Sequence, residues 1–205
     1  MITPHNNLQY LPVVESFYSI QGEGCHAGKP ACFIRLGGCD VCCNFCDSHS
    51  TWNARRFPFV SIDEIVRRVA ETPANTVIIT GGEPGMHDLS RLCSMLKERE
   101  LSLFIETAGN HQLTGEWDWI CLSPKLKKPP LPENLSKANE MKVVIQHPSD
   151  FEWAEENAAL TENCLLFLQP EWSVHEQMTP VIIEYVKQNP WWNLSVQLHK
   201  YLEIQ

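Results

Sequence analysis

Residues 76–84 read Thr-Val-Ile-Ile-Thr-Gly-Gly-Glu-Pro, and they lie at the centre of the pattern that decides the fold class. The first five residues are apolar or β-branched, which predicts a buried strand. Gly81 and Gly82 end this strand, and glycine allows a ligand to approach the backbone closely. Pro84 then fixes the turn. We therefore expect a buried strand that ends in a turn open to a ligand.

Strand-like and helix-like stretches alternate on both sides of this segment. Residues 61–71 (SIDEIVRRVAE) begin with Ser61 as a plausible N-cap and repeat apolar residues at helical spacing. We expect strands at residues 13–20, 31–36, 76–80, 101–106, 118–122, 141–146, 164–168 and 194–198. We expect helices at residues 61–71, 88–99, 150–160 and 179–188.

This alternation implies parallel strands joined by crossover connections. A closed eight-fold barrel of strands and helices takes about 250 residues, more than the 205 of this chain. We therefore expect a single α/β domain over residues 1–205, built as an incomplete (β/α) barrel with a curved, mostly parallel sheet. Such sheets carry their functional sites at the carboxyl ends of the strands.

The composition limits the classes of protein and partner. Hydrophobic residues make up 43% of the chain, enough for a folded core. The chain has 16 Lys and Arg against 25 Asp and Glu, a formal net charge of −9. A surface of this sign repels a phosphate backbone, so we expect no nucleic-acid partner. No apolar run approaches the ~18–20 residues of a membrane span, and residues 1–12 show no signal pattern. We expect a cytoplasmic protein with no membrane partner.

The cysteines are numerous and unevenly spaced. Of nine in the chain, four lie in the segment GGCDVCCNFCDSHSTW at residues 37–52, namely Cys39, Cys42, Cys43 and Cys46. Two sets of three are possible, because either Cys42 or Cys43 can join the outer pair. Three thiolates on a four-iron cluster leave one iron open for chemistry, whereas four thiolates on zinc would make a closed structural site. The remaining five are expected to be ordinary buried residues: Cys25, Cys32, Cys93, Cys121 and Cys164.

Two motifs resemble those of radical S-adenosylmethionine (SAM) enzymes. Cys39-x3-Cys43-x2-Cys46, with Phe45 before the last cysteine, is similar to their cluster motif, and Thr80-Gly-Gly-Glu-Pro84 is similar to their SAM-binding segment. More narrowly, the chain resembles the 7-carboxy-7-deazaguanine synthase family from about residue 15 to its end. The stretches that carry this resemblance are Ser19-Ile-Gln-Gly-Glu-Gly24, Phe33-Ile-Arg-Leu36, Cys46-Asp-Ser48, Glu106-Thr-Ala-Gly109, Ser123-Pro-Lys125, Gln169-Pro170 and Val196-Gln-Leu-His-Lys-Tyr201.

The resemblance implies a fold, a reaction and partners. It implies a trimmed radical-SAM barrel that acts as a homodimer, with an electron donor such as flavodoxin or ferredoxin. The reduced cluster would donate an electron to SAM, and the resulting 5′-deoxyadenosyl radical would remove hydrogen from C6 of 6-carboxy-5,6,7,8-tetrahydropterin. The ring then contracts and loses ammonia. The product, 7-carboxy-7-deazaguanine, serves queuosine and other 7-deazapurines, and Mg²⁺ supports the reaction.

The resemblance also implies which residues hold the cofactors. Cys39, Cys43 and Cys46 would bind the 4Fe–4S cluster, with Cys42 in place of Cys43 as the alternative. SAM would contact Phe45, Cys46, Asp47, Gly81, Gly82, Glu83, Ser123, Pro124, Lys125, Gln169, Pro170, Glu171 and Trp172. Ser48 stands where the family has a threonine that binds Mg²⁺. It keeps the hydroxyl oxygen that Mg²⁺ prefers but lacks the stiffening methyl.

The substrate residues are implied in the same way: Ile20, Gln21, Gly22, Arg35, Thr80 and His199. Arg35 suits the role because a guanidinium matches a carboxylate in two parallel hydrogen bonds. Gln21 offers both a donor and an acceptor to a pterin edge. No protein residue is expected to carry the radical, and Glu106 is a weaker candidate for a catalytic role.

Two other functions are compatible with the cysteine triad alone. A glycyl-radical-enzyme activase shares the triad and the small size, but it needs no pterin pocket, and the Gln-Gly-Glu-Gly and His-Lys-Tyr-Leu stretches argue against it. A non-catalytic zinc- or cluster-binding module needs neither Thr-Gly-Gly-Glu-Pro at a strand end nor Ser-Pro-Lys. The resemblance to the 7-carboxy-7-deazaguanine synthase family accounts for all of these stretches.

Overall fold

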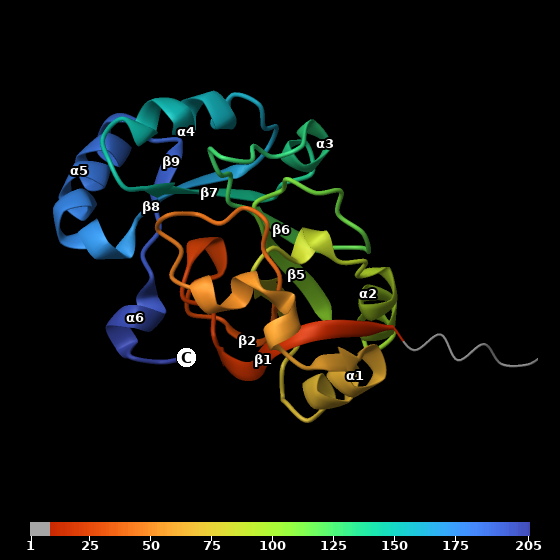
Figure 1. The fold of residues 1–205 in the computed structure, drawn as a ribbon. Coiled ribbons are helices and arrows are strands. Elements are labelled where there is room, and N and C mark those ends of the chain that lie inside the picture. The colour runs from red at the N-terminus through yellow and green to blue at the C-terminus, as the bar shows by residue number, and fades with distance from the viewer. Residues whose placement is uncertain (1–8) are drawn as a thin grey trace, which may run out of the picture.

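A computed structural model of the chain describes residues 9–205. The first eight residues, on which part of the expectation about a signal pattern rests, lie outside the described residues. The fold is one sheet in the order β3-β1-β2-β4-β5-β6-β7-β8-β9 (Figure 1). The strands are β1 (Tyr10–Ile20), β2 (Pro30–Leu36), β3 (Phe59–Ser61), β4 (Thr76–Gly81), β5 (Ser102–Thr107), β6 (Trp119–Leu122), β7 (Glu140–Ile145), β8 (Leu165–Pro170) and β9 (Trp192–Leu194).

The sheet is mostly parallel and open, as the sequence predicts. From β2 through β4 to β9, every neighbouring pair is parallel. Strand β1 instead runs antiparallel to both β2 and β3, so the two edges of the sheet are β3 and β9. The helices are α1 (Ile62–Ala70), α2 (Ser90–Lys97), α3 (Pro132–Leu135), α4 (Asp150–Ala158), α5 (His175–Gln188) and α6 (Leu198–Leu202).

Helices cover one face of the sheet in two groups (Figure 1). Helices α1 and α2 pack with β1, β2, β4 and β5 in one buried apolar cluster. Helices α4 and α5 pack with β7, β8 and β9 in another. The N-terminus of α1 is capped as expected, because the Ser61 hydroxyl accepts a hydrogen bond from the Glu64 backbone N–H at 3.3 Å. The two apolar clusters hold the helices against one face of the sheet. The other face is left for the site.

Successive side chains along a strand point to opposite faces of the sheet. In β4, Val77 and Ile79 belong to the helix-side core, whereas Ile78 packs on the opposite face with Phe33 of β2. The residue two positions beyond Ile78 on that face is Thr80, at the carboxyl end of the strand. Polar side chains therefore collect at the carboxyl ends on one face, above an apolar base.

Several expected elements differ from the structure. The strand predicted at 194–198 is absent: β9 ends at Leu194, and α6 begins at Leu198. The helix predicted from residue 179 begins at His175 and continues through Pro180, which lacks one backbone N–H without ending the helix. Strand β3 and the short helix α3 were not expected. Cys25 is exposed and Cys164 is partly exposed, so these two were wrongly predicted to be buried. No helix among residues 9–205 is long and apolar enough to cross a membrane.

Candidate active site

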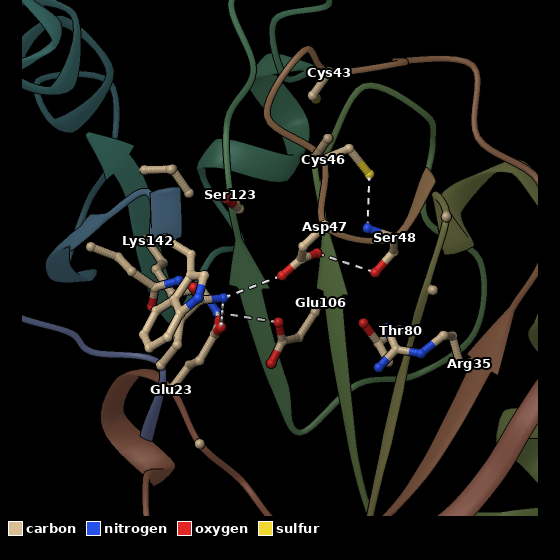
Figure 2. A pocket seen from close by; sticks show the side chains of 18 of the residues that line it. Glu23, Arg35, Cys43, Cys46, Asp47, Ser48, Thr80, Glu106, Ser123 and Lys142 are labelled. Carbon is tan, nitrogen blue, oxygen red and sulfur yellow. Dashed lines mark hydrogen bonds and ion pairs between the residues drawn. The ribbon is translucent and has the colours of Figure 1, made fainter. Parts of the chain in front are cut away.

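A pocket of about 300 Å³ lies at the carboxyl ends of the central strands. It is lined by every residue that the sequence analysis assigned to a cofactor or to the substrate, except Pro124, which is buried. Figure 2 shows the cysteine loop next to Glu106, with Arg35 and Thr80 on one side of that carboxylate and Glu23 and Lys142 on the other. The residues are distant in sequence, and the parallel strands bring them to one edge of the sheet.

The cysteine loop follows β2 and borders this pocket. Cys39, Cys43 and Cys46 line the pocket, whereas Cys42 does not. The Cys42 thiol donates to the Cys39 backbone carbonyl oxygen at 3.6 Å, and its backbone is left-handed, with a φ of 51°. Burial raises the pKa of the Cys39 and Cys43 thiols above their usual range, so a bound metal would have to displace their protons. These surroundings favour the set Cys39, Cys43 and Cys46.

The glycine turn after β4 is packed against the start of this loop. A Cβ on Gly82 would lie 2.1 Å from the Gly38 carbonyl oxygen, and the Glu83 backbone N–H donates to that oxygen at 2.7 Å. The Glu83 carboxylate is buried and accepts hydrogen bonds from the Thr107 hydroxyl at 2.5 Å and the Ala108 backbone N–H at 2.7 Å. Glu83 therefore ties the turn to the end of β5, and the turn offers mainly its backbone to the pocket.

Two further segments complete the wall on which SAM is expected. After β6, the Lys125 ammonium donates to the Ser123 hydroxyl and carbonyl oxygens, each at 2.6 Å, and burial lowers the pKa of Lys125. At the end of β8, the Gln169 side-chain oxygen accepts a hydrogen bond from the Ser195 hydroxyl at 2.7 Å. The Trp172 ring, two residues beyond Pro170, lies parallel to the His175 ring at 4.1 Å. This wall presents an aromatic face and several polar groups.

The residues expected to bind substrate, called the substrate wall below, line the same pocket. The Arg35 Nε donates to Glu15 at 2.6 Å, which orients the guanidinium at the end of β2. The Gln21 amide nitrogen donates to Glu106 at 2.7 Å. His199 packs so close to Gly22 that a Cβ there would lie 2.4 Å from its Nδ1. Burial lowers the pKa of His199, which favours the neutral ring near pH 7.

Comparison with known proteins supports one family. Residues 33–125 match the model of the radical SAM superfamily. The 7-carboxy-7-deazaguanine synthase of Flavobacterium psychrophilum is 49% identical over 96% of this chain and 93% of its own length. The chain belongs to the 7-carboxy-7-deazaguanine synthase family. The family member from Synechocystis sp. is 46% identical over 95% of this chain and 93% of its own length. The crystal structure of QueE from Escherichia coli matches with a TM-score of 0.84 and 32% identity, over 93% of this chain and 95% of that one.

Membership of this family makes the chain a radical SAM enzyme, a lyase that uses a 4Fe–4S cluster, SAM and Mg²⁺. The chemistry of the residues fits these groups. Three thiols border the pocket, and among residues 9–205 no three His, Cys, Asp or Glu side chains are gathered tightly enough for a single ion. The buried indole N–H of Trp52, a residue of the pocket wall, has no hydrogen-bond partner among the described residues. The Ser48 hydroxyl and the Asp47 carboxylate, joined at 3.2 Å, are the oxygen donors that Mg²⁺ prefers.

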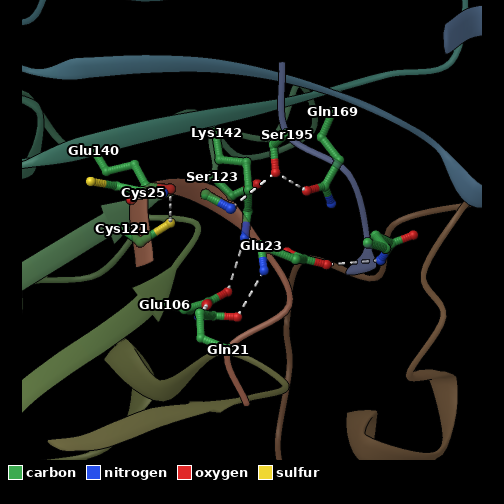
Figure 3. A network of polar contacts seen from close by, with 12 residues as sticks. Gln21, Glu23, Cys25, Glu106, Cys121, Ser123, Glu140, Lys142, Gln169 and Ser195 are labelled. Carbon is green, nitrogen blue, oxygen red and sulfur yellow. Dashed lines mark hydrogen bonds and ion pairs between the residues drawn. The ribbon is translucent and has the colours of Figure 1, made fainter. Parts of the chain in front are cut away.

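The sequence analysis missed a polar network on the same pocket (Figure 3). Lys142 on β7 is only 4% exposed and forms ion pairs with Glu23 and with Glu106, the latter at 3.2 Å. Gln197 donates to the other oxygen of Glu23 at 2.9 Å. A lysine within the apolar run of residues 141–145 was the available signal, because lysine is almost never fully buried without a partner. Further pocket-lining residues that were missed are Phe17, Phe33, Val41, Trp52, Thr107, Ala108, Val144, Lys200 and Gln205.

Proposed function

We propose that this enzyme converts 6-carboxy-5,6,7,8-tetrahydropterin into 7-carboxy-7-deazaguanine with release of ammonia, for the synthesis of queuosine or another 7-deazapurine. One observation carries the proposal: a single pocket is bordered by the three cysteines and by Gln21, Arg35 and His199. The pocket therefore offers a cofactor wall and a wall for a carboxylated, hydrogen-bonding ring within the same space.

The cofactor wall consists of short segments with separate tasks. Cys39, Cys43 and Cys46 would hold three irons of the cluster. The SAM-binding wall would consist of Phe45, Cys46, Asp47, Gly81, Gly82, Glu83, Ser123, Pro124, Lys125, Gln169, Pro170, Glu171 and Trp172. Together, the cluster and SAM would supply an organic radical that removes one hydrogen atom from the substrate. The glycines permit close approach, and Lys125 with Ser123 provides a fixed polar group.

The substrate wall orients the pterin. Arg35, whose Nε is held by Glu15, would direct its remaining N–H groups to the substrate carboxylate. Gln21, fixed by its bond to Glu106, would pair with an edge of the ring. His199 would close the site near the carboxylate. Ile20, Gly22 and Thr80 would complete the contacts, and Glu106 is the weaker candidate for a proton-transferring group.

Magnesium would bind at the end of the cysteine loop. The Ser48 hydroxyl oxygen would bind the Mg²⁺ ion, at the position where the family that this chain resembles has a threonine. Asp47 lies beside it and also accepts a hydrogen bond from Lys200 at 3.0 Å, which holds its carboxylate in a fixed direction. The Lys200 ammonium and the Ser48 hydroxyl bring the pKa of Asp47 below its usual range, although burial alone would raise it.

We also propose the setting in which the enzyme works: a single domain over residues 1–205, acting as a homodimer in the cytoplasm. Its cluster would be reduced by an acidic electron-transfer protein such as flavodoxin or ferredoxin. The exposed Lys127 supports an acidic partner, because it places a positive charge at the cysteine loop. Its ammonium donates to the Cys42 carbonyl oxygen at 3.2 Å and to the Asn44 side chain at 2.6 Å. The net charge of −9 supports neither a nucleic-acid partner nor an anionic membrane surface.

The decisive experiment is anaerobic turnover with defined components. The cluster is reconstituted, and the protein is incubated with SAM, dithionite, Mg²⁺ and 6-carboxytetrahydropterin while products are followed by mass spectrometry. We expect 7-carboxy-7-deazaguanine from the wild type and none from Cys43→Ala. SAM cleavage without this product would contradict the substrate assignment. Absence of both cleavage and visible cluster absorbance would contradict the radical mechanism.

A further inference from the structure

Lys142 lies at the centre of a continuous polar chain that crosses the pocket (Figure 3). Each of its two carboxylate partners uses one oxygen for the ammonium and the other for an amide. Glu106 accepts from Lys142 at 3.2 Å and from Gln21 at 2.7 Å. Glu23 accepts from Lys142 and, at 2.9 Å, from Gln197. This series of contacts therefore runs from the loop after β1, through β5 and β7, to the C-terminal segment.

The two ends of this series of contacts hold segments that carry proposed substrate-binding residues. At one end, the Gln21 side-chain oxygen accepts from the Glu23 backbone N–H at 3.1 Å, which closes the loop on itself. At the other end, Gln197 directly precedes α6, whose Leu198 backbone N–H donates to the Gly22 carbonyl oxygen at 2.8 Å. Helix α6 carries His199. The position of both proposed substrate contacts thus depends on carboxylates that Lys142 holds.

Stability alone does not account for a lysine at this place. Burying an ammonium and two carboxylates carries a large desolvation cost, and apolar replacements of buried ion pairs are often as stable or more stable. The side chains of Lys142 and Glu23 are 4% and 14% exposed, and that of Glu106 is 24% exposed in the pocket. The arrangement is therefore best explained by the fixed direction that it gives to the two carboxylates.

We propose that Lys142 is a positioning residue, which fixes Glu106 in the pocket and, through Glu23 and Gln197, ties the C-terminal segment of residues 195–205 to the substrate wall. It acts through these partners and not by contact with the reacting atoms. The proposal rests on the proposed function only for the identity of the substrate. Its structural part, the link between β7 and the C-terminal segment, is independent of that function.

The first test needs no substrate. Hydrogen exchange of the reconstituted full-length enzyme is measured by mass spectrometry for the wild type, for Lys142→Met and for Lys187→Met. Lys187 is the matched control, because it pairs with Glu184 on the exposed surface of α5. We expect exchange in residues 195–205 and 21–26 to be about tenfold faster in Lys142→Met, with residues 62–70 unchanged. Lys187→Met should match the wild type in all three regions.

The second test separates positioning from general destabilisation. For Lys142→Met we expect the KM for the pterin to rise about tenfold, while the dissociation constant for SAM stays within about twofold of wild type. More 5′-deoxyadenosine should be released per product, because the substrate is held less well. Lys142→Arg keeps the charge and should recover part of both losses.

Each outcome decides for or against the proposal. Hydrogen exchange at the wild-type rate in residues 195–205 of Lys142→Met would overturn it. A KM for the pterin and a ratio of 5′-deoxyadenosine to product that both equal those of the wild type would also overturn it. If Lys142→Met does not fold, Gln197→Leu breaks the same link outside the ion pairs, and unchanged exchange in that variant would overturn it. If the wild type makes no 7-carboxy-7-deazaguanine, the proposed function fails, whereas the exchange measurements still test the role of Lys142.

Discussion

Cys42 and Cys43 are neighbours in the chain but lie in different surroundings. Cys43 borders the pocket, whereas the Cys42 thiol is turned to the Cys39 carbonyl oxygen of its own loop. We expect Cys43→Ser to lose the visible absorbance of the cluster and most of its iron, and Cys42→Ser to keep both. Iron per chain and absorbance after anaerobic reconstitution provide the measurement. Loss of the cluster in Cys42→Ser, with retention in Cys43→Ser, would assign the other register.

Arg35 illustrates why charge alone does not define a binding residue. Its Nε is engaged by Glu15, which leaves the end of the guanidinium fork for a ligand. Lysine at this position would keep the charge but not the two parallel donors. We expect Arg35→Lys to raise the KM for the pterin by about tenfold, equivalent to about 1.4 kcal/mol, with the KM for SAM unchanged.

The control for Arg35→Lys is Arg68→Lys on helix α1, where the guanidinium pairs with Glu64 on the exposed surface. Steady-state kinetics of the two variants are compared under identical reconstitution. If Arg35→Lys binds the pterin as Arg68→Lys does, the substrate carboxylate is bound elsewhere.

At the scale of elements, local periodicity accounts for what the sequence predicts well. Helix α1 and strand β4 combine clear apolar spacing with a cap or a glycine stop, and both lie where expected. The stretch at 194–198 also alternates like a strand, but the Ser195 hydroxyl donates to Gln169 and accepts from the Gly24 backbone N–H. Such contacts join residues far apart in sequence. Propensity over a few residues does not reveal them, and here they override it.

The turn after β4 makes a prediction about close packing. Gly82 has no left-handed backbone, so its role is space: a Cβ would lie 2.1 Å from the Gly38 carbonyl oxygen. Backbone atoms on both sides would have to move. We expect Gly82→Ala to lower the free energy of unfolding by about 1–3 kcal/mol and to reduce iron per chain, because the cysteine loop begins at this contact.

Gly28 provides the control for Gly82→Ala. Its φ is +86°, yet nothing lies within 4 Å of a Cβ built there, so Gly28→Ala introduces backbone strain without a clash. That strain costs about 1–2 kcal/mol and should leave the iron content intact. Thermal unfolding and iron analysis of both variants separate the two effects, and equal iron content would contradict the packing argument.

At the scale of the molecule, motifs predict which residues share a site but not how they are held there. The cysteines and the glycine turn were predicted because their types and spacing match known chemistry, and Arg35 was predicted from the family resemblance. Lys142 and Glu23 are 119 positions apart, and no local pattern joins them. Lys142 lies on β7, whereas Glu23 lies beyond the end of β1, in a loop that the fold brings against β7. Ion pairs of this kind follow from the fold and cannot be predicted before it.

Lys127 places a positive charge beside the cysteine loop of an otherwise acidic protein. The chain carries a net charge of −9, so an acidic electron donor is repelled by most of the surface. Lys127 is exposed beside the cysteine loop, and its two hydrogen-bond acceptors are neutral groups, so its charge remains available to a partner. We expect Lys127→Glu to slow turnover driven by flavodoxin or ferredoxin by about tenfold, and turnover driven by dithionite to stay at the wild-type rate.

The control and the salt dependence complete this test. Lys187→Glu makes the same change of charge on α5 and should leave both rates unchanged. Added salt should slow the donor-driven reaction of the wild type more than that of Lys127→Glu, because the variant has already lost the attraction that salt screens. Cluster absorbance must be equal in all three proteins. An equal loss with dithionite and with the protein donor would place the effect of Lys127 on the cluster itself, and no loss with either would exclude this surface as the docking site.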